Sequence, residues 1–131
     1  MKLLVDSDCL VGALKEGDPH QKVATKLLKS HNEKGDTLYV LNIVLQETAT
    51  VLSHRTGMIA VRLFFQLLPS LDLSIIKLDD ELEKSAWDIF LHQTKKGTSF
   101  VDCANLAVCD FYKIDGILSF DEYYKDKLVT K

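Results

Sequence analysis

Short, uninterrupted apolar runs are spaced along the chain, and longer stretches with apolar residues at every third or fourth position separate them. The first run, Leu3-Leu4-Val5, ends abruptly in Asp6-Ser7-Asp8, a pattern typical of a strand that is covered on both faces and places a carboxylate at its end. Further strands are predicted over Thr37–Leu41, Leu71–Leu78 and Ile117–Phe120, with a final edge strand over Leu128–Thr130.

Caps, chain breakers and helical spacing predict helices between these strands. Asp8 is expected to cap a short helix over Cys9–Lys15, and Asp18-Pro19 to start a longer helix that runs to Glu33. The other predicted helices are Asn42–Arg55 with Asn42 as cap, Met58–Leu68, Asp79–Lys95, and the stretch from Ser99, as cap, to Lys113. Because parallel neighbours require crossover connections, this alternation indicates an α/β sandwich with a mostly parallel sheet of four to five strands, in one domain over residues 1–131.

Composition and charge narrow the function classes. The chain has 131 residues, of which 47% are hydrophobic and 27% charged, and its net charge of −3 gives no polybasic signature, so contact with nucleic acid would require a local patch or bound cations. Cys9, Cys103 and Cys109 are odd in number and lack C-x-x-C spacing, which argues against disulfides and structural zinc. No apolar run suits a membrane span and no signal peptide precedes the first strand, so a cytoplasmic protein without membrane contact is expected.

Four carboxylates occupy positions that call for a chemical explanation. Asp6 and Asp121 each follow an apolar strand, and in a parallel sheet both would lie at the carboxyl edge, where open α/β sheets bind ligands. Glu47 falls within the apolar arc of its helix, where a dry, unpaired carboxylate is costly. Asp102 lies in the first turn of the last helix, on the same side as Asn105.

Each acid alone also has a structural interpretation. Asp102 could complete a capping box with Ser99, Glu47 could pair with a basic residue at the edge of the core, and Asp6 and Asp121 could be turn residues. Their joint occurrence is the stronger signal, because four like charges repel one another unless a cation lies among them. A ring of oxygen ligands is what Mg²⁺ or Mn²⁺ prefers.

Four motifs also occur in a recognisable order and spacing. They are Asp6-Ser7 after the first strand, Glu47 early in a mid-chain helix, Ser99-Phe100-Val101-Asp102-Cys103-Ala104, and Ile117-Leu118-Ser119-Phe120-Asp121. In this set the chain resembles the PIN-domain ribonucleases, particularly the VapC-type toxins of toxin-antitoxin systems, over nearly its whole length. The resemblance implies a three-layer α/β/α fold in which the family's four acids, matched here by Asp6, Glu47, Asp102 and Asp121, are catalytic and bind one or two Mg²⁺ or Mn²⁺ ions that support RNA cleavage.

The resemblance also implies supporting residues. Ser7 and Ser119 match small hydroxyl positions beside the first and last acids. Asp8 replaces the usual small Ser or Asn and is interpreted as a helix cap in preference to a metal ligand. Asn105 could orient a ligand, although a solvated side chain is the favoured interpretation.

The implied reaction is metal-assisted phosphodiester hydrolysis, in which a metal-bound water attacks phosphorus. Four basic residues could assist phosphate binding, although ordinary charges at helix ends are the favoured interpretation: His54, Arg55, Lys95 and Lys96.

Two other functions fit parts of the chain. Asp6-Ser7-Asp8 also looks like the start of a haloacid-dehalogenase-type phosphatase with Asp6 as nucleophile, although Leu10 stands where that family has Thr. The second alternative is a catalytically inactive PIN-like binding module.

An apolar stripe in the predicted helix Met58–Leu68 bears on partners. It consists of Leu63, Phe64, Leu67 and Leu68, and it predicts either core packing or a partner surface. In the resembled toxins an antitoxin peptide and a second protomer cover such surfaces, so an antitoxin partner and a homodimer are expected.

Overall fold

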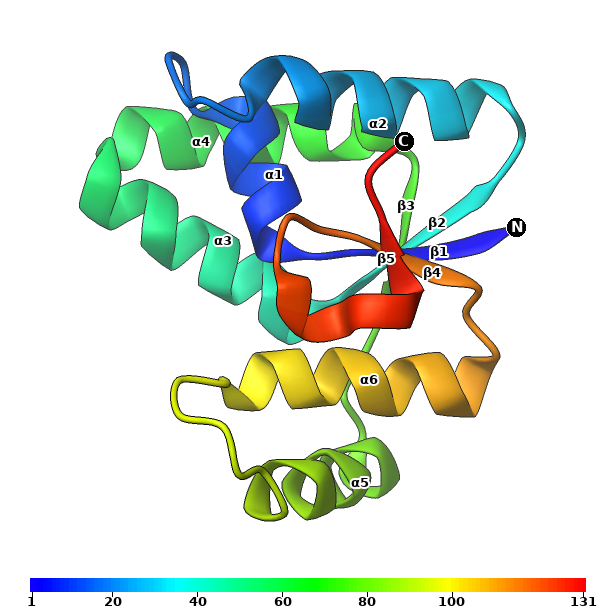
Figure 1. Cartoon of the computed structure of the whole chain (residues 1–131). Coiled ribbons are helices and arrows are strands. Elements are labelled where there is room, and N and C mark those ends of the chain that lie inside the picture. The colour runs from blue at the N-terminus through cyan, green and yellow to red at the C-terminus, as the bar shows by residue number, and fades with distance from the viewer.

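Five parallel strands form one sheet, and helices cover both of its faces (Figure 1). The strands are β1 (Lys2–Val5), β2 (Thr37–Leu41), β3 (Leu73–Ile76), β4 (Gly116–Leu118) and β5 (Leu128–Val129), in the order β3-β2-β1-β4-β5. This computed structural model describes residues 1–131. The predicted α/β sandwich is confirmed, and its sheet is parallel throughout.

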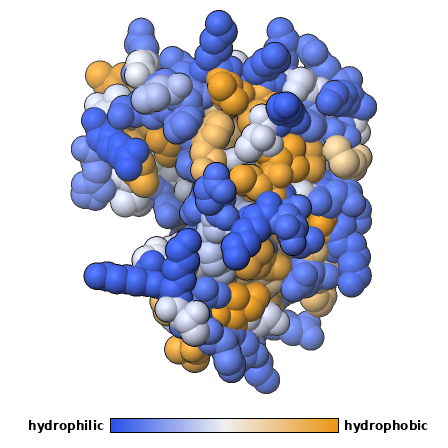
Figure 2. All heavy atoms as spheres, viewed as in Figure 1, coloured by the Kyte–Doolittle hydropathy of each residue, from blue (hydrophilic) through white to orange (hydrophobic).

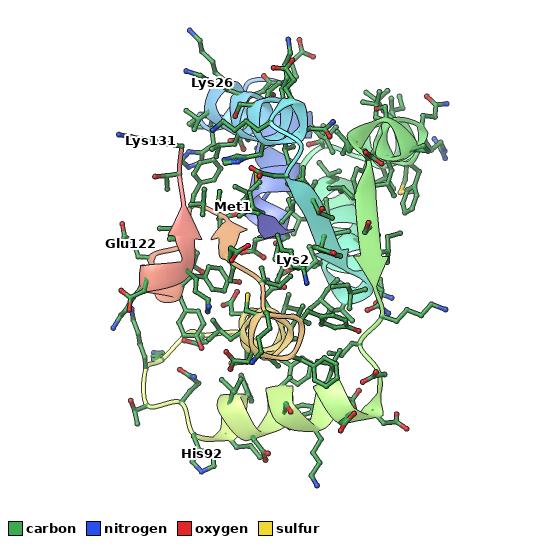
Figure 3. The ribbon with its side chains drawn as sticks, turned by 90° about the vertical axis from the view of Figure 1, so that its right-hand side faces the viewer. Met1, Lys2, Lys26, His92, Glu122 and Lys131 are labelled. Atoms are coloured by element: carbon green, nitrogen blue, oxygen red, sulfur yellow. The ribbon has the colours of Figure 1, made fainter.

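The central strand explains the uninterrupted apolar run at the start of the chain. β1 pairs with β2 on one side and β4 on the other, so that Leu4 stands opposite both Tyr39 and Ile117. The side chains of β1 alternate between the two faces, and both faces are covered by helices, so Leu3, Leu4 and Val5 are all fully buried. Figure 3 shows the sheet from β5 on one side to β3 on the other, with Met1 and Lys2 between them.

Two helical layers enclose the sheet, as Figure 1 shows. Four helices lie on one face: α1 (Ser7–Leu14), α2 (Gln21–Glu33), α3 (Asn42–Arg55) and α4 (Met58–Leu67). On the other face lie α5 (Asp80–Leu91) and α6 (Phe100–Tyr112), and two 3-10 helices complete the chain, η1 (Leu68–Leu71) and η2 (Glu122–Lys127). The chain runs outward from β1 through β2 to β3 and then returns to β4 on the opposite side of β1. The gap between β1 and β4 is therefore the topological switch point, where ligands bind in open α/β sheets.

Two of the predicted helix caps are wrong. Asp6, and not Asp8, caps α1, and its side chain accepts a hydrogen bond from the Ser7 amide. Asn42 is the first residue of α3, with Leu41 at the cap position, and its Oδ1 accepts from the Leu78 amide across the sheet edge. In both places the side chain that was predicted to cap a helix accepts a hydrogen bond from an amide far along the chain, that of Phe120 for Asp8 and that of Leu78 for Asn42.

Element ends also differ from the predicted ones. α2 begins at Gln21 because Asp18 Oδ1 accepts from the His20 amide and holds the preceding residues in a turn. β3 spans only Leu73–Ile76, which is the length over which β2 provides partners. α5 stops at Leu91, where His92 Nδ1 lies 2.7 Å from the Asp88 carbonyl oxygen and satisfies the end of the helix.

The apolar stripe of α4 divides between core and surface. Phe64 is fully buried, whereas Leu63 and Leu67 on the same helix are exposed, as is the neighbouring Phe65. The stripe is therefore partly core and partly open surface. None of the helices in the structure has the length and apolar character needed to span a membrane.

Candidate active site

Asp6 is fixed at the switch point by backbone and side-chain contacts. It directly follows β1, and its amide donates to the carbonyl oxygen of Leu118, the last residue of β4, at 3.1 Å. As the cap of α1, Asp6 accepts from the Ser7 amide through Oδ1 at 2.9 Å. Only 4% of the surface of Asp6 is exposed, so its carboxylate is buried at the carboxyl edge of the sheet.

Ser119 connects two carboxylates on the β1 side with the chain that leaves β4. Its buried Oγ lies 3.1 Å from Asp6 Oδ2 and 3.0 and 3.1 Å from the two oxygens of Asp8. The hydroxyl carries one proton and can serve one of these oxygens at a time. Asp8 Oδ2 also accepts from the Phe120 amide at 2.8 Å. The side chain of Asp8 thus holds the segment after β4 against α1, which is why it does not cap the helix.

Asp102 has a structural role and a place in the site at once. The predicted capping box is present: Ser99 Oγ accepts from the Asp102 amide, and Asp102 Oδ2 accepts from the Ser99 amide, each at 3.1 Å. The other oxygen, Oδ1, accepts from the Tyr124 hydroxyl at 3.1 Å. One carboxylate therefore starts α6 and also joins the polar cluster.

Asn105 is fully buried, so the interpretation of a solvated side chain is wrong. Its Nδ2 donates to Asp6 Oδ1 at 3.1 Å and to the Tyr124 hydroxyl at 2.9 Å. Asn105 and Tyr124 thereby link Asp6 to Asp102 through hydrogen bonds. The Asn105 Oδ1 is buried without a partner, a polar atom that calls for a further donor or a cation.

Glu47 and Asp121 stand at the periphery of this cluster. Glu47 projects from α3 and is half-buried; burial raises its pKa, the Ser7 hydroxyl opposes that rise, and the charges of Asp102 and Asp8 add to it. Asp121 is exposed, and its Oδ1 accepts from the Tyr123 amide at the start of η2. The structure therefore brings all four predicted acids to the same edge of the sheet but links only Asp6 and Asp102 by hydrogen bonds.

The electrostatics of the cluster are unfavourable for its ionised form. Burial, together with the charges of Asp8 and Asp102, raises the pKa of Asp6 to about 7. Burial also raises the pKa of Asp8, and the charge of Asp121 adds to that rise. The two ion pairs of the structure both involve Asp36, outside this cluster, so no Lys or Arg forms an ion pair with the carboxylates of the cluster. The site concentrates negative charge without an internal counter-ion.

The donor set fits a hard divalent cation by its chemistry. All the candidate ligands are carboxylate oxygens, which Mg²⁺ and Mn²⁺ prefer, and their mutual repulsion is what such a cation relieves. Asn105, whose Nδ2 contacts Asp6, also has a buried amide oxygen without a partner. In this structure no three Asp, Glu, His or Cys side chains converge closely enough to enclose an ion. The residues thus match the ligand class, and the structure defines no coordination geometry.

An open cavity of about 250 Å³ lies beside these acids. Its lining comprises Ser7, Asp8, Val11, Asp18, His20, Glu47, Val51 and Arg55. All of these residues belong to the layer that contains α1 and α3, whereas the hollow on the left side of the molecule in Figure 2 lies between that layer and the layer that contains α6. Of the basic residues considered from the sequence, only Arg55 lines this cavity; His54, Lys95 and Lys96 do not.

Three residues of the site region were not singled out from the sequence. Tyr124 joins Asp102 to Asn105, and His20 stacks on Phe120 next to Asp8. The only local signal is that Phe120 and Tyr124 flank Asp121, directly after a strand end; nothing in the spacing connects His20 with them.

Comparisons with known proteins agree with this architecture. The family model of the PIN domain matches residues 3–127. The crystal structure of VapC20 from Mycobacterium tuberculosis, a toxin that cleaves the sarcin-ricin loop, superposes with a TM-score of 0.83 at 24% identity, covering 93% of this chain and 92% of that chain. The structure of VapBC2 from Rickettsia felis, bound to a DNA fragment from its promoter, gives a TM-score of 0.74 at 16% identity, covering 98% of each chain. No curated protein sequence matches this chain. Because the family model extends over nearly all of its residues, the chain belongs to the PIN domain family.

Proposed function

We propose that this protein is an endoribonuclease that depends on Mg²⁺ or Mn²⁺. The observation that carries the proposal is the uncompensated carboxylate cluster of Asp6, Asp8 and Asp102 at the topological switch point of a PIN domain, with Glu47 and Asp121 beside it. A buried group of like charges is costly to maintain, so a cation is the simplest reason for the protein to keep it.

Asp6, Glu47, Asp102 and Asp121 are the residues that would hold the metal. When bound, the ion neutralises the carboxylates, lowers the pKa of a bound water and offsets charge on the phosphodiester. Asn105 and Tyr124 fix the orientation of Asp6 and Asp102, and Ser119 with Asp8 fixes the segment that carries Asp121. No side chain of the site needs to act as a covalent nucleophile.

RNA is the proposed substrate. The fold shared with VapC20, described as a toxin that cleaves the sarcin-ricin loop, supports a nuclease role, and the cavity beside the acids has Arg55 as a phosphate contact. A chain with a net charge of −3 offers little general attraction for RNA, so binding must come from the metal and from such local contacts.

The cellular role that fits this reaction is that of a toxin held in check by an antitoxin in the cytoplasm. The exposed apolar side chains of α4, at Ile59, Leu63 and Phe65, are a surface on which an antitoxin or a second protomer could pack. The three buried cysteines, none of them in a disulfide, fit a reducing compartment.

The match to the PIN domain gives no support to the phosphatase alternative, in which Asp6 would be a nucleophile. Burial and neighbouring charges also raise the pKa of Asp6 to about 7, which leaves less of the ionised form that a nucleophile requires. The other alternative, a catalytically inactive PIN-like binding module, is distinguished from a nuclease by the following experiment.

Cleavage of a labelled pool of structured RNAs tests the proposal. Wild-type protein is incubated with Mn²⁺, with Mg²⁺ and with EDTA, beside Asp6→Asn, Asp102→Asn and the control Asp88→Asn, which removes an exposed carboxylate of α5. We expect metal-dependent cutting by the wild type and the control, and a loss of at least about a hundredfold in the two site variants. Absence of cutting and of any metal-dependent stabilisation in the wild type would identify an inactive module.

A further inference from the structure

Two aromatic rings from distant parts of the chain stack beside the carboxylates. The His20 and Phe120 rings have centroids 4.2 Å apart and an interplanar angle of 13°. His20 is exposed at the start of α2, whereas Phe120 is half-buried between Ser119 and Asp121. Phe120 covers one face of the imidazole and leaves the rest of the ring to solvent.

Both partners of this stack are held by their backbones. The His20 amide donates to Asp18 Oδ1 at 2.8 Å, and the Phe120 amide donates to Asp8 Oδ2 at 2.8 Å. Gly12 of α1 allows the close approach of His20, because a Cβ at Gly12 would lie 3.3 Å from His20 Cβ. Phe120 is therefore held by Asp8 of the carboxylate cluster, and His20 by Asp18 and the contact with Gly12, so that the backbones of both stacked residues are fixed next to the site.

His20 also lines the cavity that contains Ser7, Asp8 and Glu47, and Phe120 does not. Of the two stacked rings, His20 alone belongs to a residue that lines this cavity, so His20 is the member of the pair that a ligand in the cavity can reach. Arg55 also lines it. A volume of about 250 Å³ is below the roughly 300–1,000 Å³ of pockets for drug-sized ligands, and it suits one ring system with its sugar.

We propose that the free face of His20, backed by Phe120, is a stacking platform for one nucleobase of the RNA, in the nucleotide next to the phosphodiester that is cut. The inference rests on the proposed nuclease function. Single-stranded RNA is commonly recognised through unstacked bases that pack on aromatic rings, and His is among the residues that provide them. The platform holds a base beside the acids by its π-face, and it tolerates different bases for the same reason.

The platform is tested by fluorescence, independently of cleavage. A short single-stranded RNA with a central 2-aminopurine is titrated with protein in Ca²⁺, which neutralises the carboxylates, and quenching reports stacking. We expect quenching by wild type and by His20→Phe, and in His20→Ala a loss of quenching with binding weakened roughly five- to 150-fold. The control His92→Ala removes an exposed histidine at the end of α5, in the layer opposite α2 (Figure 3).

Cleavage kinetics provide a double-mutant cycle in which the His20 ring is removed from the protein and the base is removed from the substrate. With Mn²⁺, His20→Ala should lower kcat/KM on an ordinary substrate by a similar factor, and this factor should fall to about one when the nucleotide next to the cut is abasic. Equal quenching by His20→Ala and wild type, or no quenching by wild type, would overturn the platform even if the protein cuts RNA. Quenching that depends on His20, without any cutting and without metal-dependent stabilisation, would support base stacking on His20 but overturn both the nuclease and the placement of that base beside a cleaved phosphodiester.

Discussion

The carboxylates of Asp6 and Asp102 each serve the fold and the site with different oxygens. Asp6 Oδ1 caps α1 and accepts from Asn105, while Oδ2 accepts from Ser119. Asp102 Oδ2 closes the capping box, while Oδ1 accepts from Tyr124. The capping-box interpretation of Asp102 is therefore confirmed, whereas Asp6, interpreted as a possible turn residue, is a helix cap; neither structural role competes with the proposed function. Because the caps fix the side chains, the site is preorganised by ordinary helix chemistry.

The raised pKa of Asp6 makes stability depend on pH. The folded protein keeps the Asp6 proton up to about pH 7, whereas the unfolded chain releases it near 3.8, so the folded state binds more protons between these values. The unfolding free energy of the metal-free protein should therefore fall as pH rises from about 4 to about 7, by on the order of a few kcal/mol. Urea denaturation in EDTA at a series of pH values measures this slope. Asp6→Asn should flatten it, and parallel slopes in the two proteins would contradict the account.

Tyr124→Phe tests the link between Asp102 and Asn105. The change removes the hydroxyl that donates to Asp102 Oδ1 and accepts from Asn105 Nδ2, while the ring remains buried. We expect a loss of about 0.5–1.5 kcal/mol in unfolding free energy and a reduced cleavage rate at unchanged KM. Tyr112→Phe is the control, because no side-chain hydrogen bond involves its exposed hydroxyl. Equal stability and activity of Tyr124→Phe and wild type would refute the positioning role.

At the scale of elements, local patterns predicted which segments are strands and helices, but not the long-range partners of their ends. The apolar run before Asp6 and the capping box at Ser99 depend on neighbours in the sequence, and both predictions are confirmed. Asp8 and Asn42 were wrongly predicted to be caps, because the amides that donate to their side-chain oxygens, those of Phe120 and Leu78, lie far along the chain. The burial of Asn105 was missed for the same reason: it depends on β1 and η2, which no helical wheel contains.

Gly116 is required for the pairing of β5 with β4. A Cβ at this position would lie 2.5 Å from Val129 Cγ2 and 3.2 Å from the Lys127 carbonyl oxygen. Gly116→Ala should therefore push β5 outward and cost about 1–3 kcal/mol of unfolding free energy, measured by urea denaturation. Gly116→Ala combined with Val129→Ala should cost less than the sum of the single changes, because one clash is removed. Additive costs would show that the contact with Val129 is unimportant.

For the whole molecule, charge and topology act together. The switch point gathers acids from β1, α3, α6 and the end of β4 into a chain whose net charge is already −3. For the proposed RNA substrate to bind such a surface, the attraction would have to come from a metal ion and from the few basic groups near the site. The net charge of the chain indicated that contact with nucleic acid would require a local basic patch or bound cations. It could not indicate which of the candidate basic residues lines the cavity, which is Arg55.

Arg55 should therefore contribute to the salt dependence of RNA binding. If it contacts one phosphate, Arg55→Gln should reduce the slope of log K against log salt by about 0.7 for single-stranded RNA. Arg62→Gln, an exposed residue of α4 outside the cavity, is the matched control and should leave the slope unchanged. Identical slopes in all three proteins, measured by anisotropy over a range of salt concentrations, would exclude this contact.

The proposed function requires that the carboxylates at the switch point bind a divalent cation. Isothermal titration of metal-free protein with Mn²⁺ tests it most directly, with wild type, Asp102→Asn and the control Asp88→Asn compared at the same pH. We expect saturable binding by wild type and control, with proton release because Asp6 must ionise, and affinity lower by at least about tenfold in Asp102→Asn. Equal affinity in all three proteins, or no binding to the wild type, would contradict it.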